Sequence, residues 1–138
     1  MKKILSLILI FCSLSFYAQE NQNENSVDIY FIRTTGFAGS ASAFKTFIDT
    51  TFVCKLNNNK YSIHHVKPGI HTFSVQFGGK KIKEKTEKFE LLTEPNKKYY
   101  IEVMFETGLF INNTYCQEIT ETSAKRKMEK LIEDNECN

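Results

Sequence analysis

The sequence has little of what marks the common enzyme classes or membrane proteins. None of its six glycines stands in the spacing of a phosphate-binding loop, and no serine stands in a GxSxG elbow. No apolar run reaches the roughly 20 residues that a membrane-spanning helix needs. The chain also shows no internal repeat and no long low-complexity segment. These absences leave the chain without any of the motifs for nucleotide binding or serine-based hydrolysis.

Without residues 1–18, the chain also has no excess of positive or negative charge. The chain holds 18 basic and 16 acidic residues, and residues 1–18 contain two of the basic residues and no acidic one. A chain that starts at Gln19 is therefore neutral, so we expect no binding to nucleic acid. Its roughly 120 residues suffice for one domain with a modest core.

The first 18 residues, MKKILSLILIFCSLSFYA, have the layout of a secretory signal peptide. Two lysines precede an apolar stretch, and the small residue Ala18 precedes a cut before Gln19; a cut after Ser15 is the alternative. A lipid anchor on Cys12 is not expected, because the bulky Phe11 precedes this cysteine and the apolar stretch continues past it. We therefore expect an exported protein that is periplasmic, associated with the outer envelope or secreted, with no transmembrane segment after cleavage.

Alternation of apolar and polar residues dominates the chain after a polar lead-in over residues 19–26. Val27, Ile29 and Phe31 share one face of the first segment, which is the period of a β-strand. Short strands at regular spacing, with turn signals between them, predict a mostly β domain over residues 27–134. The expected architecture is a small antiparallel β-sandwich of about seven to eight strands. The predicted strands are 27–33, 43–49, 51–56, 60–66, 70–77, a charged edge segment at 80–92, 97–106 and 110–119.

The period changes near the C-terminus. Ala124, Met128 and Leu131 recur at spacings of four and seven residues, which places them on one helical face. Thr122 or Ser123 can cap the start of this helix. We therefore predict one closing helix over residues 122–134, followed by a short tail over residues 135–138.

All three histidines flank the dipeptide Pro68-Gly69. Proline presets its own φ and glycine can take a positive φ, so the dipeptide predicts a structural turn. A β-hairpin about this turn would keep the apolar residues of both strands on one face. It would also make His65 and His71 cross-strand neighbours, with His64 on the opposite face.

Two neighbouring imidazoles could begin a zinc or copper site, so His65 and His71 are the metal-ligand candidates of the sequence. No third ligand stands at a recognisable spacing, although Cys54 or a carboxylate could approach in space. The sequence favours the simpler interpretation, in which two amphipathic side chains close the mouth of a hairpin. We expect no bound metal, no cofactor and no catalytic residue.

Three of the four cysteines lie beyond the signal peptide, and an exported chain meets an oxidising compartment. Cys54 shares a strand face with Phe52 and Leu56, which predicts a buried, unpaired thiol. Cys116 lies on the polar face of its strand, and a helix that runs back along this strand would return Cys137 to it. We therefore predict a Cys116–Cys137 disulfide, with an intermolecular bridge or free thiols as the alternatives.

The order of several short motifs resembles a family of bacterial exported proteins and lipoproteins. The motifs are YFIR, GFAGS, the PGxH stretch formed by Pro68, Gly69 and His71, then KKYYIEV and AKRKMEKL. The family carries a domain of unknown function, and its PGxH hairpin is similar to PEGA-type and transthyretin-like envelope modules. The likeness covers residues 27–132 and implies a small β-sandwich in the cell envelope, without catalytic residues. Many members are lipid-anchored, and this chain departs from them because it lacks a lipobox.

Taken together, these patterns favour a non-enzymatic envelope module that binds a protein, a glycan or a surface partner. The first alternative is a metal-dependent hydrolase that uses His65 and His71. The second alternative is a secreted inhibitor or effector. The identity of the partner does not follow from any motif in the chain.

Overall fold

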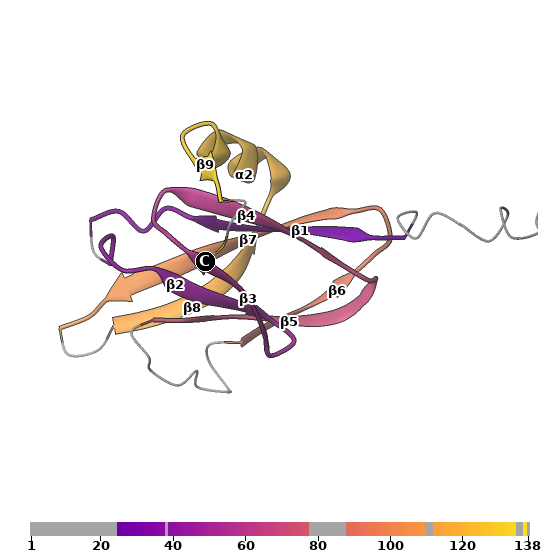
Figure 1. Cartoon of the computed structure of the whole chain (residues 1–138), viewed down its shortest axis with the longest axis horizontal. Helices are drawn as coiled ribbons and strands as arrows, with labels where there is room; N and C mark the ends of the chain where they lie inside the picture. Colours follow the sequence, from indigo (N-terminus) through magenta and orange to yellow (C-terminus); the bar gives the residue numbers. More distant parts are fainter. Residues whose placement is uncertain (1–24, 38, 78–87, 110–111, 135–136, 138) are drawn as a thin grey trace, which may run out of the picture.

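The computed structural model of the protein is a sandwich of two β-sheets with one helix on its outside (Figure 1). The structure describes residues 25–37, 39–77, 88–109, 112–134 and 137. The predicted signal peptide, Cys12 and most of the polar lead-in lie outside the described residues. The predicted class, a mostly β sandwich with one C-terminal helix, is confirmed.

Sheet A, the five-stranded sheet, has the strand order β8-β7-β1-β4-β9. Its strands pair antiparallel except at two places, where β1 runs parallel to β7 and β4 runs parallel to β9. A parallel pair needs a long connection, and the chain between β1 and β7 passes through every strand of sheet B. The strands of sheet A are β1 (Val27–Arg33), β4 (Lys60–Val66), β7 (Lys98–Thr107), β8 (Asn112–Ile119) and β9 (Ile132–Glu133).

Sheet B has four antiparallel strands in the order β3-β2-β5-β6. Strand β6 lies at an edge, as its alternation of lysine and glutamate predicts, although residues 78–87 of this charged segment lie outside the described residues. The other predicted strands start and end within two residues of their observed bounds. The strands of sheet B are β2 (Phe44–Ile48), β3 (Thr51–Leu56), β5 (Gly69–Gln76) and β6 (Lys88–Thr93).

The core lies between the two sheets and is built from alternate residues of the strands. Along β7, Ile101 and Val103 are buried in it, as the two-residue period predicts. Full burial of an aromatic or aliphatic side chain contributes about 1.5–3 kcal/mol to folding. The buried members of this core are Val27, Ile29, Phe31, Phe44, Ile48, Cys54, Leu56, Phe73, Val75, Ile101, Val103 and Cys116.

The link through Pro68-Gly69 does not form the predicted hairpin. Strand β4 pairs with β1 in sheet A, whereas β5 pairs with β2 and β6 in sheet B. The dipeptide therefore carries the chain from one sheet to the other. Gly69 has a φ of 151°, a conformation that side chains rarely adopt, so the predicted role of the glycine as a turn residue holds. The inward face of β4 carries Ser62 and His64, while Tyr61 packs with the cluster under the helix, so the apolar face that favoured the hairpin is not the inward face of this strand.

The helix α2 (Glu121–Met128) is shorter than the predicted range of 122–134. Its N-cap is Thr120, whose hydroxyl accepts a hydrogen bond from the backbone N–H of Ser123 at 3.3 Å, rather than Thr122 or Ser123. The helix covers the outer face of sheet A, where Ala124 packs with Ile32 and Tyr100. The remaining residues of the predicted helix form the chain reversal and strand β9 instead. No helix among the described residues is long and apolar enough to cross a membrane.

Candidate functional site

One side of the sandwich is bordered by β3, the edge strand of sheet B, and by β4 of sheet A, and residues of both strands line a hollow there. A groove of about 510 Å³ lies there, which we call the open groove. Four of its eight lining residues are apolar, and two histidines, an aspartate and a threonine add polar groups. The lining residues are Ile48, Asp49, Thr51, Val53, Ile63, His64, His65 and Val66.

The C-terminal segment closes one end of this side. Strand β9 pairs with β4 at Lys60 and Tyr61, and the backbone N–H of Asp134 donates to the carbonyl of Tyr61 at 2.7 Å. The Asp134 carboxylate also binds Lys60 at 3.2 Å. The carbonyl of Cys137 accepts a hydrogen bond from the backbone N–H of Lys55, on β3, at 3.4 Å. The segment therefore bridges the edges of both sheets.

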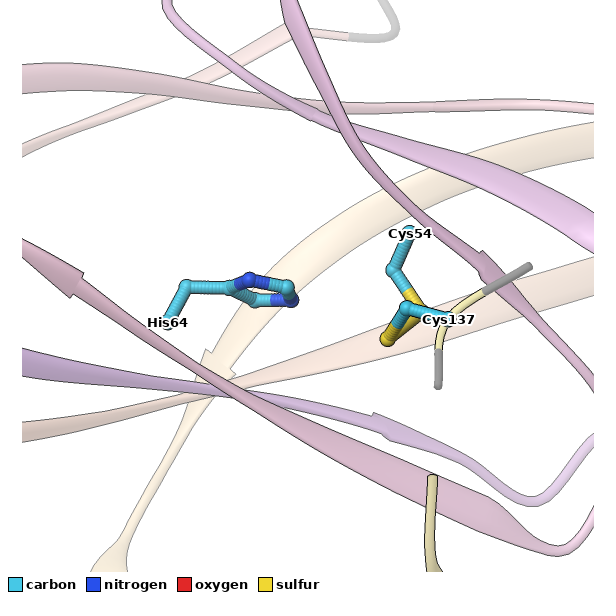
Figure 2. Close-up of side chains that lie close together, drawn as sticks. All are labelled: Cys54, His64 and Cys137. Carbon is cyan, nitrogen blue, oxygen red and sulfur yellow. A yellow bond between two sulfur atoms is a disulfide. The ribbon is translucent and has the colours of Figure 1, made fainter. Parts of the chain in front are cut away.

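A disulfide between Cys54 and Cys137 completes this bridge, with the two Cα atoms 4.5 Å apart (Figure 2). The predicted Cys116–Cys137 pairing is therefore wrong, and so is the prediction of an unpaired thiol at Cys54. Cys116 is buried in the core opposite Val103, and burial raises the pKa of its thiol. The helix covers the other face of β8, where Ile119 lies. Exposed polar residues of β8, such as Asn112 and Glu118, lie toward the ends of the strand. They led to the wrong prediction that Cys116 lies on an outer, polar face.

His64 points from β4 toward the disulfide (Figure 2). Its ring packs edge-on against Phe31, and the Ser62 hydroxyl lies 3.0 Å from its Nε2 atom. Burial, helped by the neighbouring His65, lowers the pKa of His64, so the imidazole is neutral at neutral pH. In the predicted hairpin, His64 would have pointed away from the apolar residues; instead it lies on the inner face of β4.

The other two histidines do not form a shared site. His65 is exposed on β4 and its Nδ1 atom lies 2.8 Å from Asp28. His71 lies on β5, in the other sheet, with its Nδ1 atom 2.5 Å from Asp49 and its Nε2 atom 2.7 Å from the carbonyl of Lys67. The structure therefore does not bring together the metal-ligand candidates of the sequence.

His71 connects the link between the sheets to the tight turn between β2 and β3. Burial alone would lower the pKa of His71, but the Lys67 carbonyl and the Asp49 carboxylate outweigh it and raise the pKa. Burial likewise disfavours the Asp49 anion, yet the N–H of Thr72 and the His71 ring lower the pKa of this carboxyl. Asp49 and Thr50 both have positive φ values, as a two-residue hairpin turn requires. This contact shapes one end of the open groove.

One set of potential metal ligands gathers within the described part of the chain. The ligand atoms of Cys54, His64 and Cys137 all lie within 4.8 Å of one another. We call this set the disulfide corner. The sequence analysis allowed that Cys54 or a carboxylate could approach His65 and His71, whereas the structure places Cys54 beside His64. No local signal identifies Cys137, because its approach depends on β9 pairing with a strand more than 70 residues earlier.

A second hollow adjoins the open groove at the link between the sheets. It has a volume of about 710 Å³, and His65 and Val66 line both hollows. Its other lining residues are Asn25, Ser26, Lys67, Pro68 and Pro95. The two hollows therefore lie next to each other on both sides of His65 and Val66.

No protein-family model matches the chain, and no curated protein matches it. The resemblance to exported proteins with a domain of unknown function therefore stays a prediction. Function has to be inferred from the open groove and the disulfide corner.

Proposed function

We propose that the protein is a non-enzymatic exported module that binds an extended segment of a protein partner in the open groove. Two strand edges border this groove. Strand β3 is the edge of sheet B, and β4 has β9 beside it only at Lys60 and Tyr61. The rest of β4 therefore has no strand beside it on that side among the described residues. Uncovered strand edges offer backbone N–H and C=O groups to a further strand.

The main support for this proposal is that the C-terminal segment of the chain already pairs with both of these strand edges. Its C-terminal segment adds β9 to β4 and then binds β3 through the backbone of Lys55 and Cys137. Both contacts are of the kind that an added peptide strand makes. The open groove continues along the same two edges, beyond the point that the C-terminal segment reaches.

The walls of the groove suit a peptide better than a glycan. Ile48, Val53 and Ile63 are apolar, and among the described lining residues no tryptophan, tyrosine or phenylalanine offers a flat stacking surface. Alternate side chains of an extended peptide could insert between these walls, while its backbone binds the edges. The groove volume of about 510 Å³ is typical of a binding site.

Export is the second part of the proposal. The Cys54–Cys137 disulfide supports it, because disulfides persist in oxidising compartments and are rare in the cytosol. The layout of residues 1–18 supports it independently. A secreted inhibitor or effector would use the same groove, so this alternative differs in the partner rather than in the mode of binding.

The hydrolase alternative depends on a metal shared by His65 and His71. Since these residues bind separate aspartates, no described geometry favours that alternative.

A displayed library of random linear peptides, panned on the mature protein, tests the binding mode. We expect selected peptides to bind the unmodified protein and to lose affinity by about tenfold or more with Thr51→Trp, which fills the groove from an exposed position. Lys45→Trp is the matched control, because this exposed residue lies on β2 away from the groove. Hydrogen exchange should slow at β3 and at residues 62–66 when a peptide binds. Failure to select any peptide, or peptides that bind Thr51→Trp as tightly, would contradict the proposal.

A further inference from the structure

The disulfide corner holds three side chains that could bind a metal ion if the disulfide were reduced. Cysteine thiolates and an imidazole are the ligands that zinc prefers in proteins, and in the oxidised chain the two sulfurs are bonded to each other. His64 points at them from the neighbouring sheet (Figure 2). This geometry does not depend on what the open groove binds.

The spacing of the three side chains is close to that of a zinc site. A zinc ion lies about 2.3 Å from each thiolate sulfur and about 2.0–2.1 Å from an imidazole nitrogen. Tetrahedral angles then separate the ligand atoms by roughly 3.5–3.8 Å. All three ligand atoms already lie within 4.8 Å of one another. Once the S–S bond is opened, small side-chain rotations therefore suffice to bring them to this spacing.

Contacts other than the disulfide hold Cys137 near Cys54. The backbone N–H of Cys137 donates to the Asp134 carboxylate at 3.4 Å, and its carbonyl accepts from Lys55 at 3.4 Å. Asp134 is itself held by Lys60 at 3.2 Å and by the carbonyl of Tyr61 at 2.7 Å. Opening the disulfide thus leaves several polar contacts that keep the second thiol in the corner.

His64 is prepared to act as a ligand. The Ser62 hydroxyl and the edge of Phe31 fix the orientation of its ring. A neutral imidazole nitrogen is a common metal ligand in proteins.

We propose that Cys54, His64 and Cys137 bind one zinc ion when a dithiol opens the disulfide. The dithiol passes two electrons and two protons to the S–S bond, which becomes two thiols, and the dithiol becomes its own disulfide. Zinc then displaces the two thiol protons. Two thiolates and Zn²⁺ sum to zero charge, so the complex suits the buried position of Cys54. Three protein ligands leave one position of a tetrahedral zinc ion for water.

The test uses the mature protein after reduction with a phosphine under nitrogen and removal of the excess reductant. Cobalt(II) is titrated first, because thiolate-to-cobalt charge-transfer absorption reports sulfur ligands directly, and zinc is then used to displace it. We expect one metal ion per reduced chain and none on the oxidised chain. His64→Phe preserves a ring in the same place and should weaken binding by at least about 100-fold, since even outer residues of zinc sites matter 10–100-fold.

Two variants are matched controls. Cys116→Ala removes the remaining mature thiol, which is buried elsewhere, and His65→Ala removes the adjacent exposed imidazole. Both should leave the metal affinity unchanged. The absence of a charge-transfer band in the reduced protein would overturn the proposal. So would equal affinities of the unmodified protein and His64→Phe.

If reduction unfolds the protein, refolding by zinc tests the proposal. In that case zinc must restore the near-ultraviolet circular dichroism of the reduced chain, and it must do so at about 100-fold lower concentration than with His64→Phe. Two cysteines of an unfolded chain would bind metal without any preference among the three histidines. Zinc that fails to restore the fold, or restores both chains equally, would contradict the proposal.

Discussion

Arg33 has the largest fully buried side chain of the described residues, and its guanidinium shows how a charge is accommodated in this core. It donates to the carbonyls of Leu56 at 2.7 Å and Gly39 at 2.6 Å, and it stacks 3.6 Å above the ring of Phe44. Burial lowers its pKa to about 10, which leaves it charged at neutral pH. Gly39 itself has a φ of 75°, and a Cβ there would meet Phe105 at 3.2 Å. The arginine thus connects the loop after β1 to the end of β3.

Replacement of this arginine by lysine should therefore destabilise the fold although the charge is kept. An ammonium is a point charge and cannot reach two carbonyls and stack on a ring at the same time. We expect Arg33→Lys to lower the free energy of unfolding by about 2–4 kcal/mol. Denaturant titration measures the loss, and Arg126→Lys on the exposed face of α2 is the control. An equal midpoint for the two variants would show that the contacts of Arg33 add nothing to stability.

The link between β4 and β5 carries the chain from sheet A to sheet B. His71 lies on β5 and binds the Lys67 carbonyl of this link as well as Asp49 of the turn between β2 and β3. Its side chain is 14% exposed. Two segments that are separate in sequence, the link with the start of β5 and the turn between β2 and β3, therefore meet at one charged contact.

This contact should make stability depend on pH. The pKa of His71 is raised above the ordinary 6.5, so its contribution is fully present below pH 6.5 and is lost as pH rises through the raised value. The pKa of Asp49 is lowered below 3.8, so its contribution is present above pH 3.8 and is lost as pH falls through the lowered value. The contact is therefore strongest between those two ordinary values, at about pH 4 to 6.5.

A double-mutant cycle with His71→Gln and Asp49→Asn measures the contact. We expect the coupling energy from denaturant titrations to be larger at about pH 5.5 than at about pH 9. A coupling energy that stays constant or grows between these two pH values would mean that the ion pair does not form.

At the scale of the whole molecule, two closures hold the sheets together. The core fills the space between them, and the C-terminal segment bridges their open side through β9 and the disulfide. The cysteines are separated by 83 positions in sequence, so the bridge removes much of the freedom of the unfolded chain. The same segment leaves the open groove uncovered. The C-terminal segment can therefore bridge the two sheets while a peptide binds in the groove beside it.

Removal of the bridge should therefore cost stability without changing the fold class. We expect the double variant Cys54→Ala, Cys137→Ala to lose about 2–5 kcal/mol in the free energy of unfolding. Cys116→Ala should lose less, because only one buried sulfur is removed. Peptide mapping of the native protein without reduction should recover a Cys54–Cys137 peptide. Recovery of a Cys116–Cys137 peptide would show that the C-terminal segment follows another path.

The candidate site shows where prediction from the sequence reaches its limit. The sequence drew attention to the histidines around Pro68-Gly69 and allowed that Cys54 could approach them in space. The arrangement was wrong, because the hairpin pairing assumed that neighbouring strands in sequence are neighbours in a sheet. His64 lies inward, and it is Cys137 that completes the set.

The sequence by itself determined the class of fold, the bounds of most strands and the inward face of β7. These properties depend on periods of two and four residues, which local sterics and burial impose on the chain. Only the tertiary structure decided that β4 and β5 lie in different sheets, that the chain returns to β4 as β9, and that Cys54 meets Cys137. Each of these depends on which distant segments fit together. A two-residue period records which way a side chain faces, but it carries no record of the strand that will lie beside it.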